Sequence, residues 1–187
     1  MTANEDILEF LNGLYPLSDD IRQRLLLILK QEDFKKKTHL LKEGQISNHV
    51  YFIVKGLLRV YYLKEEVEVC SGLLCEGGVV ISVKSFFDRV RSDEYIQALE
   101  DLTVYYISHD ELEALYRDFP EFNIVGRRLI TAYYVKSEER NFLLRRQTAQ
   151  EKIDYFKEHF DHLVPRVPRK DIASYLGVTL ETLSRLG

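Results

Sequence analysis

The sequence predicts an α+β protein, in which helices flank an antiparallel sandwich or barrel and a helix-turn-helix lies at the C-terminal side. Residues 33–108 hold short runs of Val, Ile, Leu, Tyr and Phe between Gly, Asn and charged breaks, which is typical of antiparallel strands. Residues 110–159 space their apolar side chains as helices do. Residues 169–187 place two short apolar patterns around a glycine, which indicates two crossing helices.

The first predicted elements are two helices within residues 4–31. Apolar residues recur there at helical spacing, and Pro16 interrupts the pattern. Ser18 or Asp19 can cap the second helix, because either side chain accepts hydrogen bonds from the free N–H groups of a first turn. Seven predicted strand runs follow: HLLKEG, HVYFIVKG, LLRVYYLK, VEVCSGLL, GGVVISV, YIQALEDL and TVYYIS.

Three more helices and a linker come after the strands. A short helix is predicted over 109–118, and Pro120 opens a long helix that runs to Arg146, since proline suits the first helical turn. Apolar residues at heptad-like spacing give the long helix a contact surface. Residues 148–159 are a further helix, and 164–168 (VPRVP) are a stiff linker.

The last segment, RKDIASYLGVTLETLSRLG, has the pattern of a helix-turn-helix. Gly177 lies at the turn, where a positive φ is needed, and Ala173 lets the helices approach closely. Thr179 can cap the second helix, and Glu181 follows in its first turn, where negative charge is favoured. An ordinary helical hairpin is the alternative. The residues that would point outward to a DNA major groove are Thr179, Glu181, Thr182 and Arg185.

Composition and charge narrow the function classes. The chain has 187 residues, 45% hydrophobic and 30% charged, as in ordinary globular proteins. No apolar run approaches the roughly 20 residues of a membrane span, and no secretory signal is visible. Residues 140–187 carry nine Lys/Arg against six Asp/Glu, whereas residues 1–139 carry 17 against 24, so a chain of net charge −4 has a mildly basic C-terminal part. This distribution is typical of DNA contact by one end.

A second motif resembles a known signature. Gly44, followed after six residues by Tyr51-Phe52-Ile53-Val54-Lys55-Gly56-Leu57-Leu58-Arg59-Val60, is similar to the signature of the cyclic-nucleotide-binding β-roll. Both glycines would turn the chain between strands. With the long helix and the terminal helix-turn-helix, the order of elements resembles the Crp–Fnr family of bacterial transcription regulators over essentially the whole chain.

The resemblance implies an N-terminal antiparallel β-roll, which is a double-stranded β-helix of jelly-roll type. It implies a sensor domain over 1–119, a dimerisation helix over 120–146 and a DNA-binding domain over 147–187. The expected protein is a cytoplasmic homodimer that binds DNA, has RNA polymerase as a further candidate partner and has no membrane segment. Binding of an unknown small-molecule effector in the roll would change the relative orientation of the two DNA-reading domains. The alternative for the apolar stripe of the long helix is packing against its own roll.

The expected effector pocket departs from the family pattern. Family members that bind cyclic AMP have a glutamate for the ribose and an arginine for the phosphate, and alignment places Ser82 and Ser92 at these positions, with Asp93 beside the second. We therefore expect no cyclic AMP binding. The alternative for the polar residues here is a solvated loop. The candidate pocket residues are Ser82, Lys84, Ser85, Arg89, Arg91, Ser92, Tyr133, Tyr134 and Ser137.

The C-terminal motif also departs from the family. Regulators of this kind usually continue into a β-hairpin wing, whereas this sequence stops at Gly187, so a truncated winged helix without a complete wing is expected. Leu180 stands where a base-contacting arginine is frequent. The alternative function is therefore a ligand-sensing or interaction module of the same fold that has lost DNA binding. The candidate DNA-binding residues are Arg169, Lys170, Thr179, Glu181, Thr182 and Arg185, each of which can also be a solvated surface residue.

Metal sites and enzymatic activity are not expected. Cys70 and Cys75 are too few for a disulfide framework and lack further ligands for a metal, so they are expected to be reduced thiols. His159 and His162 fall at a predicted helix end. The sequence shows no pairing of a nucleophile with a base and no paired catalytic carboxylates, so no catalytic residue and no cofactor is assigned.

Overall fold

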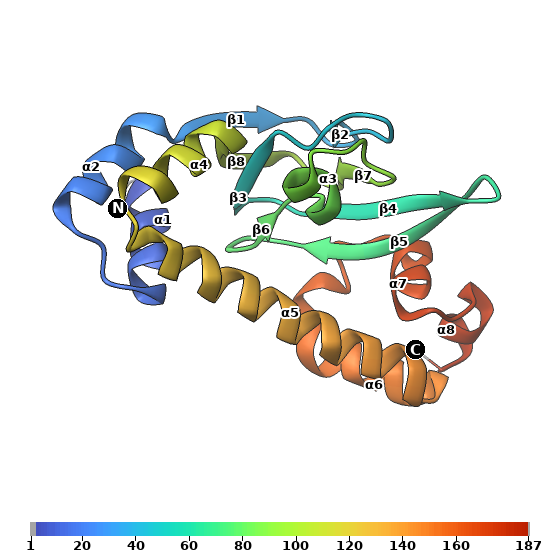
Figure 1. The fold of residues 1–187 in the computed structure, drawn as a ribbon. Coiled ribbons are helices and arrows are strands. Elements are labelled where there is room, and N and C mark those ends of the chain that lie inside the picture. The colour runs from blue at the N-terminus through green and yellow to red at the C-terminus, as the bar shows by residue number, and fades with distance from the viewer. Residues whose placement is uncertain (1–2, 187) are drawn as a thin grey trace.

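The computed structural model describes residues 3–186 and has the predicted α+β architecture (Figure 1). Its eight strands form two antiparallel four-stranded sheets, with the strand orders β1-β8-β3-β6 and β2-β7-β4-β5. Gly187, the last residue of the expected truncated winged helix, lies outside the described residues. The strands are β1 (Lys30–Phe34), β2 (His39–Leu41), β3 (His49–Lys55), β4 (Leu58–Lys64), β5 (Val67–Leu74), β6 (Val79–Val80), β7 (Tyr95–Ala98) and β8 (Leu102–Ser108).

Helices flank the roll and make up the C-terminal part of the chain, with α5 running from the N-terminal helices toward α6 (Figure 1). Among the described residues, none of them is long and apolar enough to cross a membrane. The helices are α1 (Ala3–Leu14), α2 (Asp19–Ile28), α3 (Val83–Asp88), α4 (His109–Asp118), α5 (Phe122–Arg146), α6 (Ala149–Phe160), a 3-10 turn η1 (Asp161–Leu163), α7 (Arg169–Leu176) and α8 (Leu180–Leu186).

Local capping chemistry sets several helix starts. The Ser18 side chain accepts a hydrogen bond from the Ile21 N–H at the start of α2, which decides between the two predicted caps. Ser108 and Glu111 form a capping box at α4, and Thr148 and Glu151 form another at α6. Each box satisfies two backbone N–H groups that a first turn leaves free, so these helices begin where the sequence predicts.

Two predictions about local structure were wrong. The second helix was expected to reach residue 31, but α2 ends at Ile28 and Lys30–Phe34 form β1. This strand pairs antiparallel with β8 and is mostly exposed, so it has no apolar alternation to reveal it. The run GGVVISV was predicted as one strand, but only Val79–Val80 pair with β3, and the short helix α3 starts at Val83.

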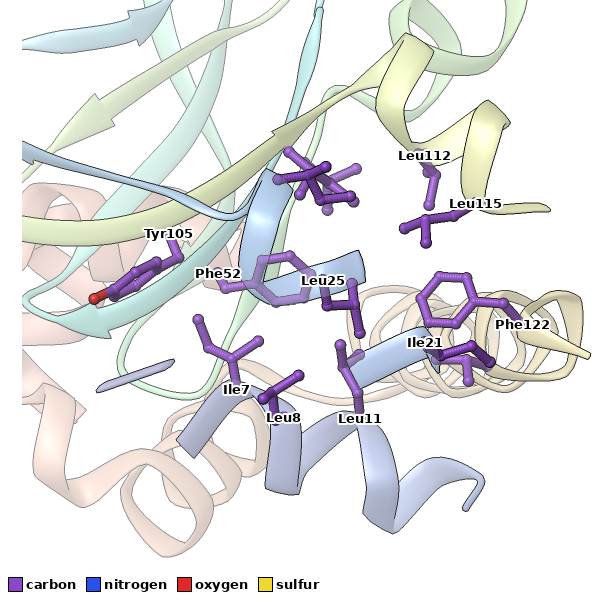
Figure 2. Packing of buried hydrophobic residues seen from close by; sticks show 14 of the residues in the cluster. Ile7, Leu8, Leu11, Ile21, Leu25, Phe52, Tyr105, Leu112, Leu115 and Phe122 are labelled. Carbon is purple, nitrogen blue, oxygen red and sulfur yellow. The ribbon is translucent and has the colours of Figure 1, made fainter. Parts of the chain in front are cut away.

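The largest part of the core joins the N-terminal helices to the roll. Figure 2 shows side chains from α1, α2, α4 and the start of α5 meeting Phe52 and Tyr105 of the roll. Burial of this apolar surface is the main favourable contribution to folding, at about 25 cal/mol per Å². The side chains labelled there are Ile7, Leu8, Leu11, Ile21, Leu25, Phe52, Tyr105, Leu112, Leu115 and Phe122.

The interior of the roll is a second cluster, which includes Leu58, Val60, Ile96 and Val104. The predicted turn glycine Gly56 has a φ of +100°, and a Cβ there would lie 2.6 Å from the Asp101 carbonyl oxygen. No other residue fits this turn without displacing the backbone at Asp101 and Leu102, where β8 begins. Gly44 has a φ of +81°, so it also occupies the predicted turn conformation.

A third cluster joins the roll to the helix-turn-helix. It brings Leu57 of the roll and Leu143 of α5 together with apolar side chains from α6, α7 and α8. Figure 1 shows α7 lying beside β5. The C-terminal helices are therefore packed onto the second sheet of the roll.

Candidate functional site

The predicted helix-turn-helix is present as α7 and α8. Gly177 joins them with a φ of +63°, and its N–H donates to the carbonyl oxygens of Ala173 and Ser174. The Thr179 hydroxyl accepts a hydrogen bond from the Thr182 N–H at 3.1 Å, so Thr179 caps α8 as predicted. Leu183 is buried in the seam between the helices, which sets the outward face of α8.

Glu181 and Arg185 are exposed on α8, Thr179 is exposed at its start, and Thr182 is partly exposed. Charged side chains on the free face of a second helix are what a base-reading element needs. The structure therefore brings four of the predicted DNA-binding residues to one surface.

The two cations at the start of α7 have partners on the protein. Arg169 donates to the Leu183 carbonyl oxygen at 3.1 Å, which ties α7 to α8. Lys170 forms an exposed ion pair with Glu68 of β5 at 3.3 Å. Both residues remain exposed. Exposed ion pairs of this kind are weak and exchange readily with solvent or phosphate.

A buried ion pair fastens α7 to the roll. Arg59 of β4 donates to Asp171 at 2.7 Å and to Glu68 at 2.8 Å, and its other donors reach Gln97 of β7. Cys70 N–H donates to the Ser174 hydroxyl at 2.9 Å beside this pair. The hydrogen bond from Arg59 holds the pKa of Glu68 below its ordinary value.

Arg166 holds the predicted linker 164–168 to the roll. Its guanidinium contacts Glu76 at 2.9 Å and Glu100 at 2.7 Å, which lie on two turns of the roll. The Arg166 hydrogen bonds lower the pKa of Glu76 to about 2. The linker is therefore fixed by charge as well as by its two prolines.

A groove of about 1460 Å³ lies between the roll, α5 and α6. It includes most of the predicted pocket residues, namely Ser82, Lys84, Ser85, Arg91, Ser92, Tyr133 and Ser137. Arg89 and Tyr134 are not among its lining residues. The Arg89 side chain bonds the Ser47 carbonyl and Asn48 instead, and Tyr134 is 62% exposed on another face of α5.

The polar end of the groove is closed by its own hydrogen bonds. The Ser82 hydroxyl lies 3.0 Å from that of Ser92 and donates to the Glu94 carboxylate at 3.0 Å. Ser82 and Ser92 are both buried. Ser85 is also buried, accepting from the Ser47 N–H and donating to the Val90 carbonyl oxygen. At this end of the groove the serine hydroxyls already form hydrogen bonds within the protein, and the Glu94 carboxylate would repel a phosphate.

Sequence reasoning missed two groove residues, Glu94 and Arg140. Glu94 lies two residues after Ser92, and its role depends on the folded position of Ser82. Arg140 donates to the Tyr175 carbonyl oxygen at 3.1 Å and lies over the Tyr175 ring. Neither the Ser82–Glu94 contact nor the Arg140–Tyr175 contact leaves a local sequence pattern. Each joins residues that are well separated in the sequence, and Glu and Arg are common on protein surfaces.

The two cysteines lie on β5 and just after it. Cys70 is buried, and burial raises the pKa of its thiol to about 12. Cys75 Sγ lies 3.6 Å from Nε2 of His162. Within residues 3–186 no group of three or more His, Cys, Asp and Glu side chains is placed to hold a metal ion.

Comparison with known proteins adds to this geometry. Residues 31–119 match the cyclic nucleotide-binding domain family. The fumarate and nitrate reduction regulatory protein of Yersinia pestis is 28% identical over 175 residues, which are 86% of this chain and 68% of that protein. The nitrogen fixation regulation protein FixK of Azorhizobium caulinodans is 24% identical over 81% of this chain and 65% of its own length. The chain thus spans about two thirds of the length of these relatives.

Solved structures agree with the fold. FixK2 from Bradyrhizobium japonicum has a TM-score of 0.72 and 25% identity, with 85% of this chain and 82% of that chain covered. The c-di-GMP responsive global regulator CLP of Xanthomonas campestris has a TM-score of 0.70 and 15% identity, with 90% and 89% covered. Roll, long helix and terminal helices therefore define a transcription regulator built on a cyclic nucleotide-binding domain. The chain is therefore similar to transcription regulators of the Crp–Fnr type, and these relatives are regulatory proteins rather than enzymes.

Proposed function

We propose that the chain is a homodimeric, sequence-specific DNA-binding regulator that uses α8 to read bases. The exposure of Glu181 and Arg185 on α8, above a buried seam, is the observation that carries this proposal. An arginine can fork onto guanine, and a glutamate can accept from the cytosine amino group. Thr179 and Thr182 lie on the same surface and would complete the base contacts.

Arg169 and Lys170 are the proposed phosphate contacts. Both are exposed at the start of α7. Lys170 exchanges its weak contact with Glu68 for a phosphate in this proposal, and Arg169 keeps α7 and α8 in register. Phosphate contacts position a protein on the duplex without reading its sequence.

The proposed dimer forms along α5. This helix exposes Tyr134 and Val135 in its middle, each by at least half of its surface. Exposed apolar side chains gathered on one helix are typical of a surface that a second copy covers. Two copies related by a two-fold axis would present two α8 helices, which suits a palindromic site. The proposed divisions are a sensor domain over 1–119, α5 as the dimerisation helix within 120–146, and the DNA-binding domain over 147–187.

The proposed effector is not cyclic AMP. Ser82, Ser92 and Glu94 bond one another at the polar end of the groove, and a phosphate there would meet a carboxylate. As a regulator that binds DNA, the protein would act in the cytoplasm and have RNA polymerase as a partner.

A mobility-shift assay against genomic fragments from around its own gene tests the proposal. We expect a shifted complex whose base preference is relaxed by Arg185→Ala, whereas Lys170→Ala weakens binding to every fragment alike. Equal losses for both variants on every fragment would show that α8 does not read bases. Absence of any shifted complex would favour the alternative, a sensing module without DNA binding.

A further inference from the structure

One face of α5 lines the groove, and Arg140 is the cation at one end of this face. Tyr133, Ser137 and Arg140 are spaced by four and three residues, so they lie on the same face of the helix. All three line the groove between α5 and the roll. Arg140 therefore lies at the end of the groove nearest the helix-turn-helix, where it contacts Tyr175 of α7.

The guanidinium of Arg140 forms only some of the hydrogen bonds that it could donate. One nitrogen, Nη2, donates to the Tyr175 carbonyl oxygen at 3.1 Å, and the group lies 4.5 Å above the Tyr175 ring. Its Nε is buried and has no hydrogen-bond partner, and no carboxylate within residues 3–186 forms an ion pair with it. A buried donor of a cation without a partner is unfavourable, so an anion that bound it would gain affinity.

The charges along the groove differ from one end to the other. Burial raises the pKa of Tyr133, the negative charge of Glu94 acts in the same direction, and the positive charge of Arg140 acts in the opposite one. Tyr133 therefore lies within reach of both charges. An anion is repelled at the Glu94 end and attracted at the Arg140 end.

The walls between these ends are largely apolar. Leu74 and Ile81 of the roll and Leu129 and Ile130 of α5 contribute to them. A largely apolar groove in which one guanidinium keeps a buried N–H without a partner suits a ligand with an apolar body and a single anionic group.

We propose that this groove binds an amphipathic monoanion, such as a carboxylate, whose charged group pairs with Arg140 and whose apolar body lies along Tyr133. Because the same guanidinium holds the Tyr175 carbonyl, Arg140 also links occupation of the groove to α7. The second part of this inference rests on the proposed function, since α7 belongs to the DNA-reading unit.

A matched pair of fluorescent probes tests the first part. The anionic probe is 8-anilinonaphthalene-1-sulfonate, and the neutral one is N-phenyl-1-naphthylamine, which lacks the sulfonate. We expect Arg140→Gln to weaken binding of the anionic probe by at least about tenfold and to change binding of the neutral probe by less than about twofold. Arg145→Gln, an exposed arginine of α5 outside the groove, should leave both affinities unchanged.

Equal loss of both probes in Arg140→Gln, or no loss of the anionic one, would overturn the assignment. The neutral probe also reports whether the variant keeps its groove. Decanoate should displace the anionic probe from the wild type, and failure to do so would limit the site to sulfonates and overturn the carboxylate assignment.

Hydrogen exchange tests the second part. Saturation with decanoate should change amide exchange in residues 169–176 in the wild type and not in Arg140→Gln. An unchanged wild-type pattern would overturn the link to α7. These measurements need no DNA, so probe binding that depends on Arg140 in a chain without DNA affinity would refute the proposed function and leave the ligand site standing.

Discussion

Arg59 Nη1 lies 2.7 Å from Oδ1 of Asp171, across 112 residues of sequence. Both residues are buried, with exposed fractions of 5% and 4%. The pair fastens the first helix of the helix-turn-helix to the outside of the roll. Oδ2 of Asp171 has no hydrogen-bond partner among the described residues. The buried carboxylate is therefore hydrogen-bonded through only one of its two oxygens, which is unfavourable away from water.

Removal of this pair should destabilise the folded chain. We expect Asp171→Ala to lower the free energy of unfolding by about 1–3 kcal/mol, less than for a fully isolated charge, because Arg59 keeps Glu68 and Gln97 as partners. Urea unfolding measures the change. Lys170→Ala is the control, since its exposed pair with Glu68 contributes about 1 kcal/mol or less. An Asp171→Ala variant no less stable than Lys170→Ala would contradict the role of the buried pair.

The Arg166 contacts predict a loss of stability in acid. The pKa of Glu76 is lowered from 4.5 to about 2, mainly by hydrogen bonds from Arg166. Because the pKa of Glu76 is lower in the folded protein than in the unfolded chain, its ionised carboxylate stabilises the fold at any pH above the unfolded-chain pKa. This contribution falls as the pH drops from about 4.5 through about 2. Because Glu76 is partly exposed, we expect the effect to be about 1 kcal/mol or less.

Urea unfolding at a series of pH values checks this prediction. Glu76→Gln should flatten the decline in this window relative to the wild type, since the variant has no carboxyl to titrate there. A variant with the same slope would mean that other carboxyl groups account for the acid sensitivity.

The serine-lined end of the groove predicts that cyclic AMP does not bind. Ser82 and Ser92 are buried and bonded to each other, and Glu94 supplies negative charge beside them. We expect calorimetric titration to give a dissociation constant weaker than about 1 mM. Saturable binding in the micromolar range would mean that the phosphate is held elsewhere in the groove.

The exposed face of α5 predicts a dimer. Tyr134 is 62% exposed and does not line the groove, so Tyr134→Glu should separate two copies without altering the effector site. Sedimentation should show a wild-type dimer and a largely monomeric variant, because a charge in an apolar interface is poorly solvated. Lys136→Ala, an exposed polar neighbour, should remain dimeric. A wild-type monomer at all concentrations would refute the interface.

Much of the fold could be predicted from local pattern. Gly177 and Thr179 mark the turn and the start of α8 by short-range chemistry, and the structure confirms both. Alternating apolar runs indicated most strands. The exception is Lys30–Phe34, whose strand depends on pairing with β8 about 70 residues away and therefore leaves no local signal.

The site was less predictable than the fold. Ser82 and Ser92 were placed in the pocket by the resemblance to the family pattern, but the participation of Glu94 follows from how the loop closes. Arg59 and Asp171 each look like ordinary surface charges in the sequence, and only the docking of α7 on β4 and β5 buries them. The role of Arg140 could not be predicted from the sequence for the same reason. Long-range packing decides which charges lose water, and one sequence alone does not show it.

Selection of binding sites from random DNA tests the central proposal most directly. We predict enrichment of two half-sites related by two-fold symmetry, with centres about one helical turn (10–10.5 bp) apart, and relaxed preference at one base pair of each half-site for Arg185→Ala. No enrichment, or single half-sites that Arg185→Ala leaves unchanged, would contradict a dimer that reads DNA through α8.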